Sequence, residues 1–181
     1  MNAERFREIN FMLTFHEDGK VAALPIPEVL EYLSVTLAGE RGDDADPDRL
    51  LSIGVRLSVH PERLQITQGL LEWLGSSRSA RSLERVSLVL RGLWTYGEPA
   101  ADEAEQIVSA LTHERSLTST DETAEFEYVL TLCHFARWLR PGPMQSGVLT
   151  ALQAAMERGF ADEQYSRLAR QAIEKAMKFL T

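Results

Sequence analysis

Residues that could bind a metal come first, because zinc and calcium sites have well-defined ligand spacings. His113 and Glu114 begin a pattern typical of zinc protease helices, but Leu117 occupies the position of the second histidine. The segment Asp44–Asp48 begins like a calcium-binding loop, but Arg49 replaces the glycine that the sharp turn of such a loop requires. We therefore expect no metal site and no other cofactor.

Cys133 and His134 are neighbours of the types that act as nucleophile and base in thiol enzymes. Adjacent residues of a helix project about 100° apart, so these two side chains would not face each other. The chain contains no glycine-rich nucleotide-binding motif, no phosphate-binding loop and no hydrolase nucleophile motif. We expect no catalytic residues, and the alternative is an enzyme whose acid and base carboxylates meet only in the fold.

Carboxylates occur in three groups along the chain. Each group lies at or just before the predicted start of a helix, where carboxylates cap the helix and interact favourably with its dipole. If the helices stack as hairpins, groups on equivalent connections would align into an acidic strip that faces a basic protein. The candidate partner-binding carboxylates are Glu40, Asp43, Asp44, Asp46, Asp48, Asp102, Glu103, Glu105, Asp121, Glu122 and Glu125.

Aromatic residues near predicted helix ends are a second set of candidates for partner binding: Trp73, Trp94 and Tyr96. Aromatic side chains frequently anchor protein interfaces. The alternative is that their large rings fill the core at the end of a helical hairpin.

The chain is acidic, with net charge −8 from 27 acidic and 19 basic residues. A surface of this sign repels the phosphate backbone of nucleic acids and attracts basic proteins. We therefore expect a protein partner with a basic surface and no binding to nucleic acid.

Composition and length indicate a folded globular protein. Hydrophobic residues make up 44% and charged residues 25% of the 181 residues, so we expect a single domain over residues 1–181.

No window approaches 18 uncharged apolar residues, which predicts no membrane contact. The N-terminal sequence lacks the apolar run of a secretory signal, and a single cysteine suits a reducing compartment. These features predict a cytoplasmic protein.

The N-terminal segment, residues 1–26, is predicted to form a short β-hairpin. Ile9, Phe11, Leu13 and Phe15 alternate with other residues at the period of a half-buried strand, and an Asp-Gly pair at residues 18–19 suits a turn. The alternative is a helix over residues 3–15. The alternation favours the hairpin.

From Pro27 onward the apolar residues recur every three or four positions, which predicts helices. Proline and aspartate occur at predicted helix starts, as at Asp46 and Pro47, and glycine occurs at predicted helix ends, as at Gly75. Residues 27–181 are therefore predicted to form seven or eight helices. Six of them have clear expected ranges: 47 to about 58, 82–94, 102 to about 114, 121–139, 144–158 and 162–180.

Two helix pairs share a sequence pattern. Trp94 ends a predicted helix and is followed by a turn with glycine and proline, and about 44 residues later Trp138 stands in the same position. A two-helix unit of this period resembles the HEAT-like α-helical repeat over, at most, residues 80–160. The resemblance implies antiparallel hairpins that stack into a curved surface for binding macromolecules. An irregular helical bundle is the alternative architecture.

Small acidic helical proteins of this general form are also similar to bacterial immunity proteins, which neutralise a toxin. This resemblance implies an inhibitor that covers a basic site on another protein, and it supplies the leading functional hypothesis. The alternative is a structural or regulatory scaffold that self-associates into a homo-oligomer, with the edge of the N-terminal hairpin as a contact.

Overall fold

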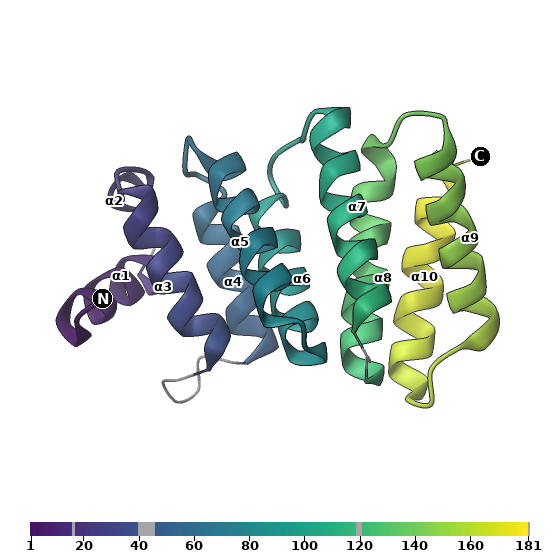
Figure 1. The fold of residues 1–181 in the computed structure, drawn as a ribbon, viewed down its shortest axis with the longest axis horizontal. Helices are drawn as coiled ribbons and strands as arrows, with labels where there is room; N and C mark the ends of the chain where they lie inside the picture. The colour runs from purple at the N-terminus through teal and green to yellow at the C-terminus, as the bar shows by residue number, and fades with distance from the viewer. Residues whose placement is uncertain (16, 40–45, 119–120, 181) are drawn as a thin grey trace. The chain divides into compact units, whose positions relative to one another are not determined.

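The computed structural model describes residues 1–15, 17–39, 46–118 and 121–180. Within these ranges the chain forms ten α-helices, one 3-10 turn and no strand, so the predicted mainly α class is confirmed (Figure 1). The helices are α1 (Ala3–Thr14), α2 (Asp18–Ala22), α3 (Ile26–Ala38), α4 (Pro47–Leu57), α5 (Arg63–Ser77), α6 (Ala80–Leu93), α7 (Ala101–Leu117), α8 (Glu122–Phe135), α9 (Pro143–Arg158) and α10 (Glu163–Leu180), and the 3-10 turn η2 is Ala136–Trp138.

The β-hairpin predicted for residues 1–26 is wrong, because α1 and α2 occupy this segment. Asn2 caps α1, and its side-chain oxygen accepts a hydrogen bond from the backbone N–H of Arg5 at 2.8 Å. Phe11 and Phe15, which produced the alternating pattern, are 52% and 62% exposed. The buried residues of α1 have helical spacing instead: Phe6, Ile9, Met12 and Leu13.

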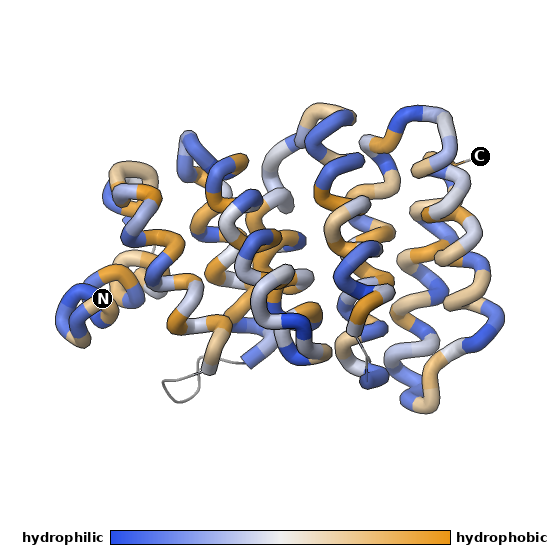
Figure 2. The backbone as a smooth tube through the Cα atoms, in the orientation of Figure 1, coloured by the Kyte–Doolittle hydropathy of each residue, from blue (hydrophilic) through white to orange (hydrophobic). Residues whose placement is uncertain are grey.

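Along the helices, apolar and polar residues succeed one another at short intervals, as expected for helices buried on one side (Figure 2). In the part of the chain that the structure describes, no helix combines the length and the apolar character needed to span a bilayer.

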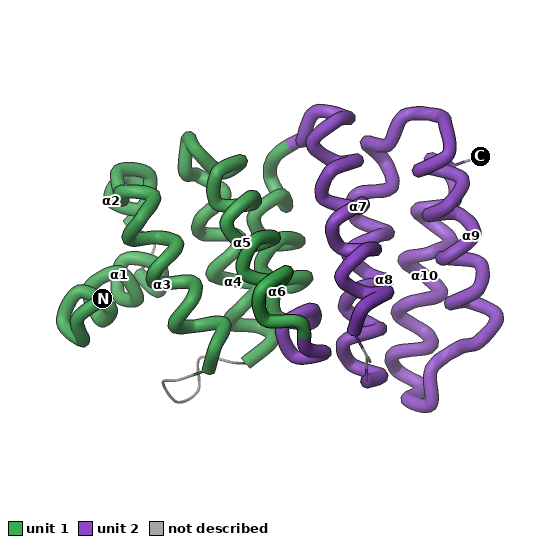
Figure 3. The backbone as a smooth tube through the Cα atoms, viewed as in Figure 1, with its two compact units in different colours: residues 1–78, 85–97 green, residues 79–84, 98–181 purple. Residues whose placement is uncertain are grey.

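The residues group into two compact units (Figure 3). Unit 1 comprises residues 1–78 and 85–97, and unit 2 comprises residues 79–84 and 98–181. The single domain expected over residues 1–181 stays a prediction.

In unit 1, α3 packs against α5, and α1 packs against α2 and α4. The backbones of α4 and α6 come into direct contact at Gly54 and Gly92, where neither residue has a side chain to separate them. Trp94 closes this core at 2% exposure, and its indole N–H donates to the hydroxyl of Thr67 at 3.0 Å. The guanidinium of Arg63 lies 4.6 Å from the centre of the Trp94 ring, so one side chain connects several parts of the unit.

In unit 2, α10 packs against α8, α9 and η2, and α8 also packs against α7. Phe126 of α8 stacks on Tyr165 of α10, with ring centroids 4.2 Å apart, and meets Phe160 edge to face at 5.7 Å. This aromatic cluster fixes the start of α10 against the first half of α8. Gly159 ends α9 with φ at +66° and ψ at −169°, a conformation that favours glycine, so the chain can turn into the connection that carries Phe160.

Candidate functional site

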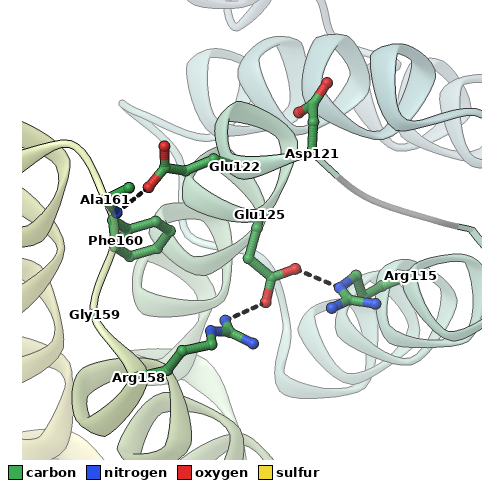
Figure 4. A pocket seen from close by; sticks show the side chains of 8 residues that line it. All are labelled: Arg115, Asp121, Glu122, Glu125, Arg158, Gly159, Phe160 and Ala161. Carbon is green, nitrogen blue, oxygen red and sulfur yellow. Dashed lines mark hydrogen bonds and ion pairs between the residues drawn. The ribbon is translucent and has the colours of Figure 1, made fainter.

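An open hollow of about 570 Å³ lies at the first turn of α8 in unit 2 (Figure 4). The start of α8 supplies Asp121, Glu122 and Glu125 to it, the three carboxylates that the sequence analysis selected in this region. Arg115 comes from the last turn of α7, and Arg158 comes from the last turn of α9. The connection between α9 and α10, residues 159–161, forms the remaining wall.

Glu125 is the central side chain of this hollow. The Nε–H of Arg115 donates to its Oε2, and the Nη2 of Arg158 donates to its Oε1 at 2.7 Å (Figure 4). Burial raises the pKa of the Glu125 carboxyl, but the hydrogen bonds and charges of the two arginines together outweigh burial and hold it below its ordinary value. The carboxylate is therefore ionised at neutral pH and links three helices.

The arrangement follows from the polarity of the helices. The first turn of α8 has partial positive charge and carries carboxylates, whereas the last turns of α7 and α9 have partial negative charge and carry arginines. Because both C-terminal turns flank the start of α8, the arginines meet the carboxylates. Sequence reasoning missed Arg115, Arg158 and Phe160, although a basic residue in the last turn of an expected helix was an available signal.

Asp121 and Glu122 satisfy backbone groups at helix starts. Asp121 caps α8 by accepting a hydrogen bond from the backbone N–H of Ala124 at 2.8 Å. One oxygen of Glu122 accepts from the backbone N–H groups of Ala161 and Asp162, just before α10. Both side chains remain exposed.

The carboxylates at the start of α7 lie at the other end of the α7–α8 pair. The two helices run in opposite directions (Figure 1), so Glu105 meets Arg140 beyond the end of α8, through hydrogen bonds of 3.0 and 2.6 Å. These hydrogen bonds lower the pKa of the Glu105 carboxyl. Glu103 accepts from the backbone N–H of Ala100 at 2.8 Å, and Asp102 is exposed. The structure therefore does not bring this group together with the carboxylates at the start of α8.

The first predicted group is described only in part. Asp46 caps α4, and its side chain accepts from the backbone N–H of Asp48 at 2.9 Å, as the sequence analysis expected of this aspartate. Asp48 is exposed in the first turn of α4. The predicted site residues Glu40, Asp43 and Asp44 lie outside the described residues.

The three candidate aromatic residues, all in unit 1, have different environments. Trp94 is a core residue, which leaves it no exposed surface for a partner. Trp73 is half-buried on α5, and Tyr96, in the turn after α6, is 79% exposed. Only Trp73 and Tyr96 can contact another protein without rearrangement of the fold.

Among the described residues, no group of three or more histidine, cysteine, aspartate or glutamate side chains could hold a metal ion. The Nδ1 of His60 accepts from the backbone N–H of Glu62 at 3.1 Å, which leaves its Nε2–H to donate to the carbonyl of Leu24 at 2.9 Å. His60 therefore holds two loops together.

Comparison with family models, curated proteins and solved structures gave no match to this chain.

Proposed function

We propose that this chain is a cytoplasmic protein-binding module whose partner is a basic protein, and that it inhibits this partner as immunity proteins do. Its net charge of −8 favours a partner of opposite sign and speeds their encounter. Asp48 is exposed and forms no ion pair among the described residues, so it is available to a basic surface, and Asp102 is exposed near Arg140.

The observation that carries the proposal is the exposure of Tyr96. Its side chain is 79% exposed and, within the described residues, makes no hydrogen bond and no ring contact. The ring therefore contributes nothing visible to the fold, whereas tyrosine is among the residues that most often dominate the binding energy of protein interfaces. Its position in a turn also leaves it accessible to a partner.

Five of the predicted site carboxylates in unit 2 support binding over catalysis. Glu103, Glu105, Asp121, Glu122 and Glu125 all accept hydrogen bonds from backbone or arginine groups of this chain. Carboxylates held in this way stabilise helix ends and helix contacts, which accounts for their positions without a catalytic role.

The HEAT-like repeat belongs to the same proposal. In unit 2, a short connection joins α7 to α8 and another joins α9 to α10, and α8 packs against both α9 and α10. Contact between successive helix pairs is what a stack of repeats requires.

A pull-down with the purified chain tests the proposed function. From a lysate of the native cells we expect one stoichiometric basic protein, identified by mass spectrometry, whose retention falls as salt is raised. The variant Tyr96→Ala should weaken its capture at least tenfold, with an unchanged circular dichroism spectrum, because the loss of an interface aromatic costs 2 kcal/mol or more, on the order of a hot spot. Tyr96→Phe serves as the matched control, since it retains the ring. Absence of a stoichiometric basic partner at both low and moderate salt would exclude the proposal.

Self-association is a second candidate, favoured by the exposed pair Phe11 and Phe15 on α1. Their ring centroids are 4.3 Å apart, and the rings form an apolar patch in solvent. If the patch joins two copies, light scattering coupled to size-exclusion chromatography should give a mass that rises with concentration. The double variant Phe11→Ser and Phe15→Ser should stay monomeric at every concentration. A wild-type chain that is already monomeric at the highest concentration would contradict this candidate.

A further inference from the structure

An apolar groove of about 310 Å³ lies between α3 and α5 in unit 1, and we call it the α3–α5 groove. Leu33 and Leu37 of α3 are each 2% exposed, so the bottom of the groove belongs to the core. Leu30 and Trp73 are half-buried in its walls. Its volume is at the lower end of the range of about 300–1,000 Å³ found for ligand pockets, which suits one or two side chains.

Gly69 on α5 determines how closely the two helices approach beside the groove. A Cβ atom at this position would lie 3.0 Å from Cδ1 of Leu30 and would collide with Cδ2 of the same side chain. Leu30 therefore rests directly on the backbone of α5. Because this contact belongs to the fold, the shape of the groove is present before any partner binds.

The charge of the groove has one sign. Glu72 is the one ionisable residue that lines it among the described residues, and this carboxylate is exposed and forms no ion pair there. An apolar side chain that enters the groove with a neighbouring cation would gain attraction to Glu72, whereas a neighbouring anion would be repelled.

We infer that the α3–α5 groove receives an apolar side chain of the partner protein that has a lysine or arginine next to it in the sequence. The inference rests on the proposed function, to which it adds a docking surface and a local sequence for the partner. Trp73 supplies the aromatic wall that anchors such contacts, and Glu72 selects the basic flank. The partner's basic character and the groove's single carboxylate are complementary in charge.

Two synthetic peptides that differ only in charge test the inference on the intact chain. One carries a leucine flanked by lysines, and the other carries the same leucine flanked by glutamates. Chemical-shift titration of the leucine methyl and tryptophan indole signals should place the lysine peptide at Leu30 and Trp73. We expect its dissociation constant to be about fivefold lower than that of the glutamate peptide, the ratio that weak surface ion pairs produce.

Variants of the chain separate the contributions of charge and shape. Glu72→Lys should reverse the peptide preference, while Glu174→Lys, an equal change in net charge on the exposed face of α10, should leave the preference almost unchanged. Ser34→Trp, which fills the groove from α3, should abolish binding of both peptides. Equal affinity for the two peptides, no shift at the groove, or an unchanged preference in Glu72→Lys would overturn the inference.

The natural partner distinguishes failure of this inference from failure of the proposed function. A basic partner that Glu72→Lys and Ser34→Trp still capture fully would leave the function standing and remove the groove from it. Selective peptide binding at the groove without any captured basic protein would support the groove and remove the inhibitor function. Shifts of the groove signals that grow with the concentration of the chain alone would identify a second copy as the occupant and overturn the inference.

Discussion

Replacing Gly92 by alanine is expected to destabilise the folded chain by about 3 kcal/mol, the upper part of the usual range for overpacking a core. A Cβ atom on Gly92 would collide with the carbonyl oxygen of Leu51 and lie 2.9 Å from Cα of Gly54. These neighbours are backbone atoms of α4, so they cannot rotate away as a flexible side chain would. The helices α4 and α6 must therefore move apart, and the core of unit 1 loses contacts along both.

Chemical denaturation at neutral pH measures this effect, as a lower midpoint with an unchanged slope. Gly54→Ala should behave similarly, because its Cβ would collide with the carbonyl oxygen of Val89 on the opposite helix. Gly147→Ala is the matched control, since this glycine lies within α9 and, apart from the backbone of its own helix, no heavy atom lies within 4 Å of its Cβ position. That substitution should stabilise the chain by up to about 1 kcal/mol through helix propensity. A free energy of unfolding for Gly92→Ala within about 0.5 kcal/mol of the wild-type value, the usual range for surface substitutions, would contradict the close contact between α4 and α6.

Local sequence signals predicted the helices where a cap and an apolar face agreed. Asp46 caps α4 as expected, and Gly159 follows the last residue of the expected helix 144–158, because each acts through backbone groups a few residues away. The helix end predicted at Gly75 is wrong. The helix α5 continues to Ser77 and ends at Arg78, whose φ is +39° and whose side chain donates to the carbonyl of Gly75.

The error at the N-terminus has a similar origin. The alternating residues of α1 and their helical spacing are both present in the sequence, and the burial of one face decides between them. Phe11 and Phe15 are exposed to solvent, so the four alternating residues do not share one buried face as they would in a half-buried strand. The cap at Asn2 was a short-range signal for the helix that the alternation outweighed.

The candidate site could be predicted only in part, because its two halves are far apart in the chain. The carboxylates at the start of α8 were recognisable from their own segment, through capping and the helix dipole. Arg115 and Arg158 lie 10 and 33 residues from Glu125, and only the packing of α7 and α9 beside α8 brings them to it. The contact between Gly54 and Gly92 was unpredictable for the same reason, since the sequence of one helix does not specify which other helix packs against its backbone.

The Glu125 contacts lead to the second large expected effect, in the variant Glu125→Gln. The substitution keeps the shape of the side chain but removes the charge that faces two guanidinium groups, of which Arg115 is 31% and Arg158 is 55% exposed. Hydrogen bonds between charged groups contribute about 1.5–3 kcal/mol each when shielded from solvent. Because one arginine is largely exposed, we expect a total loss of about 2 kcal/mol at neutral pH.

The pH dependence separates a charge effect from a packing effect. The pKa of Glu125 is lower in the folded chain than the ordinary 4.5, so its ionised form stabilises the fold fully above that value. This stabilisation is lost as the pH falls through the lowered pKa of the folded state, where the carboxyl becomes protonated. The difference in stability between wild type and Glu125→Gln should therefore be largest near neutral pH and shrink as the pH falls below 4.5 in denaturation series. A stability difference that stays constant from neutral pH down to about pH 3 would show that the substitution acts through packing alone.

Glu105→Gln, at the exposed pair with Arg140, is the control for this effect. It should change stability far less at every pH, because solvent screens that ion pair.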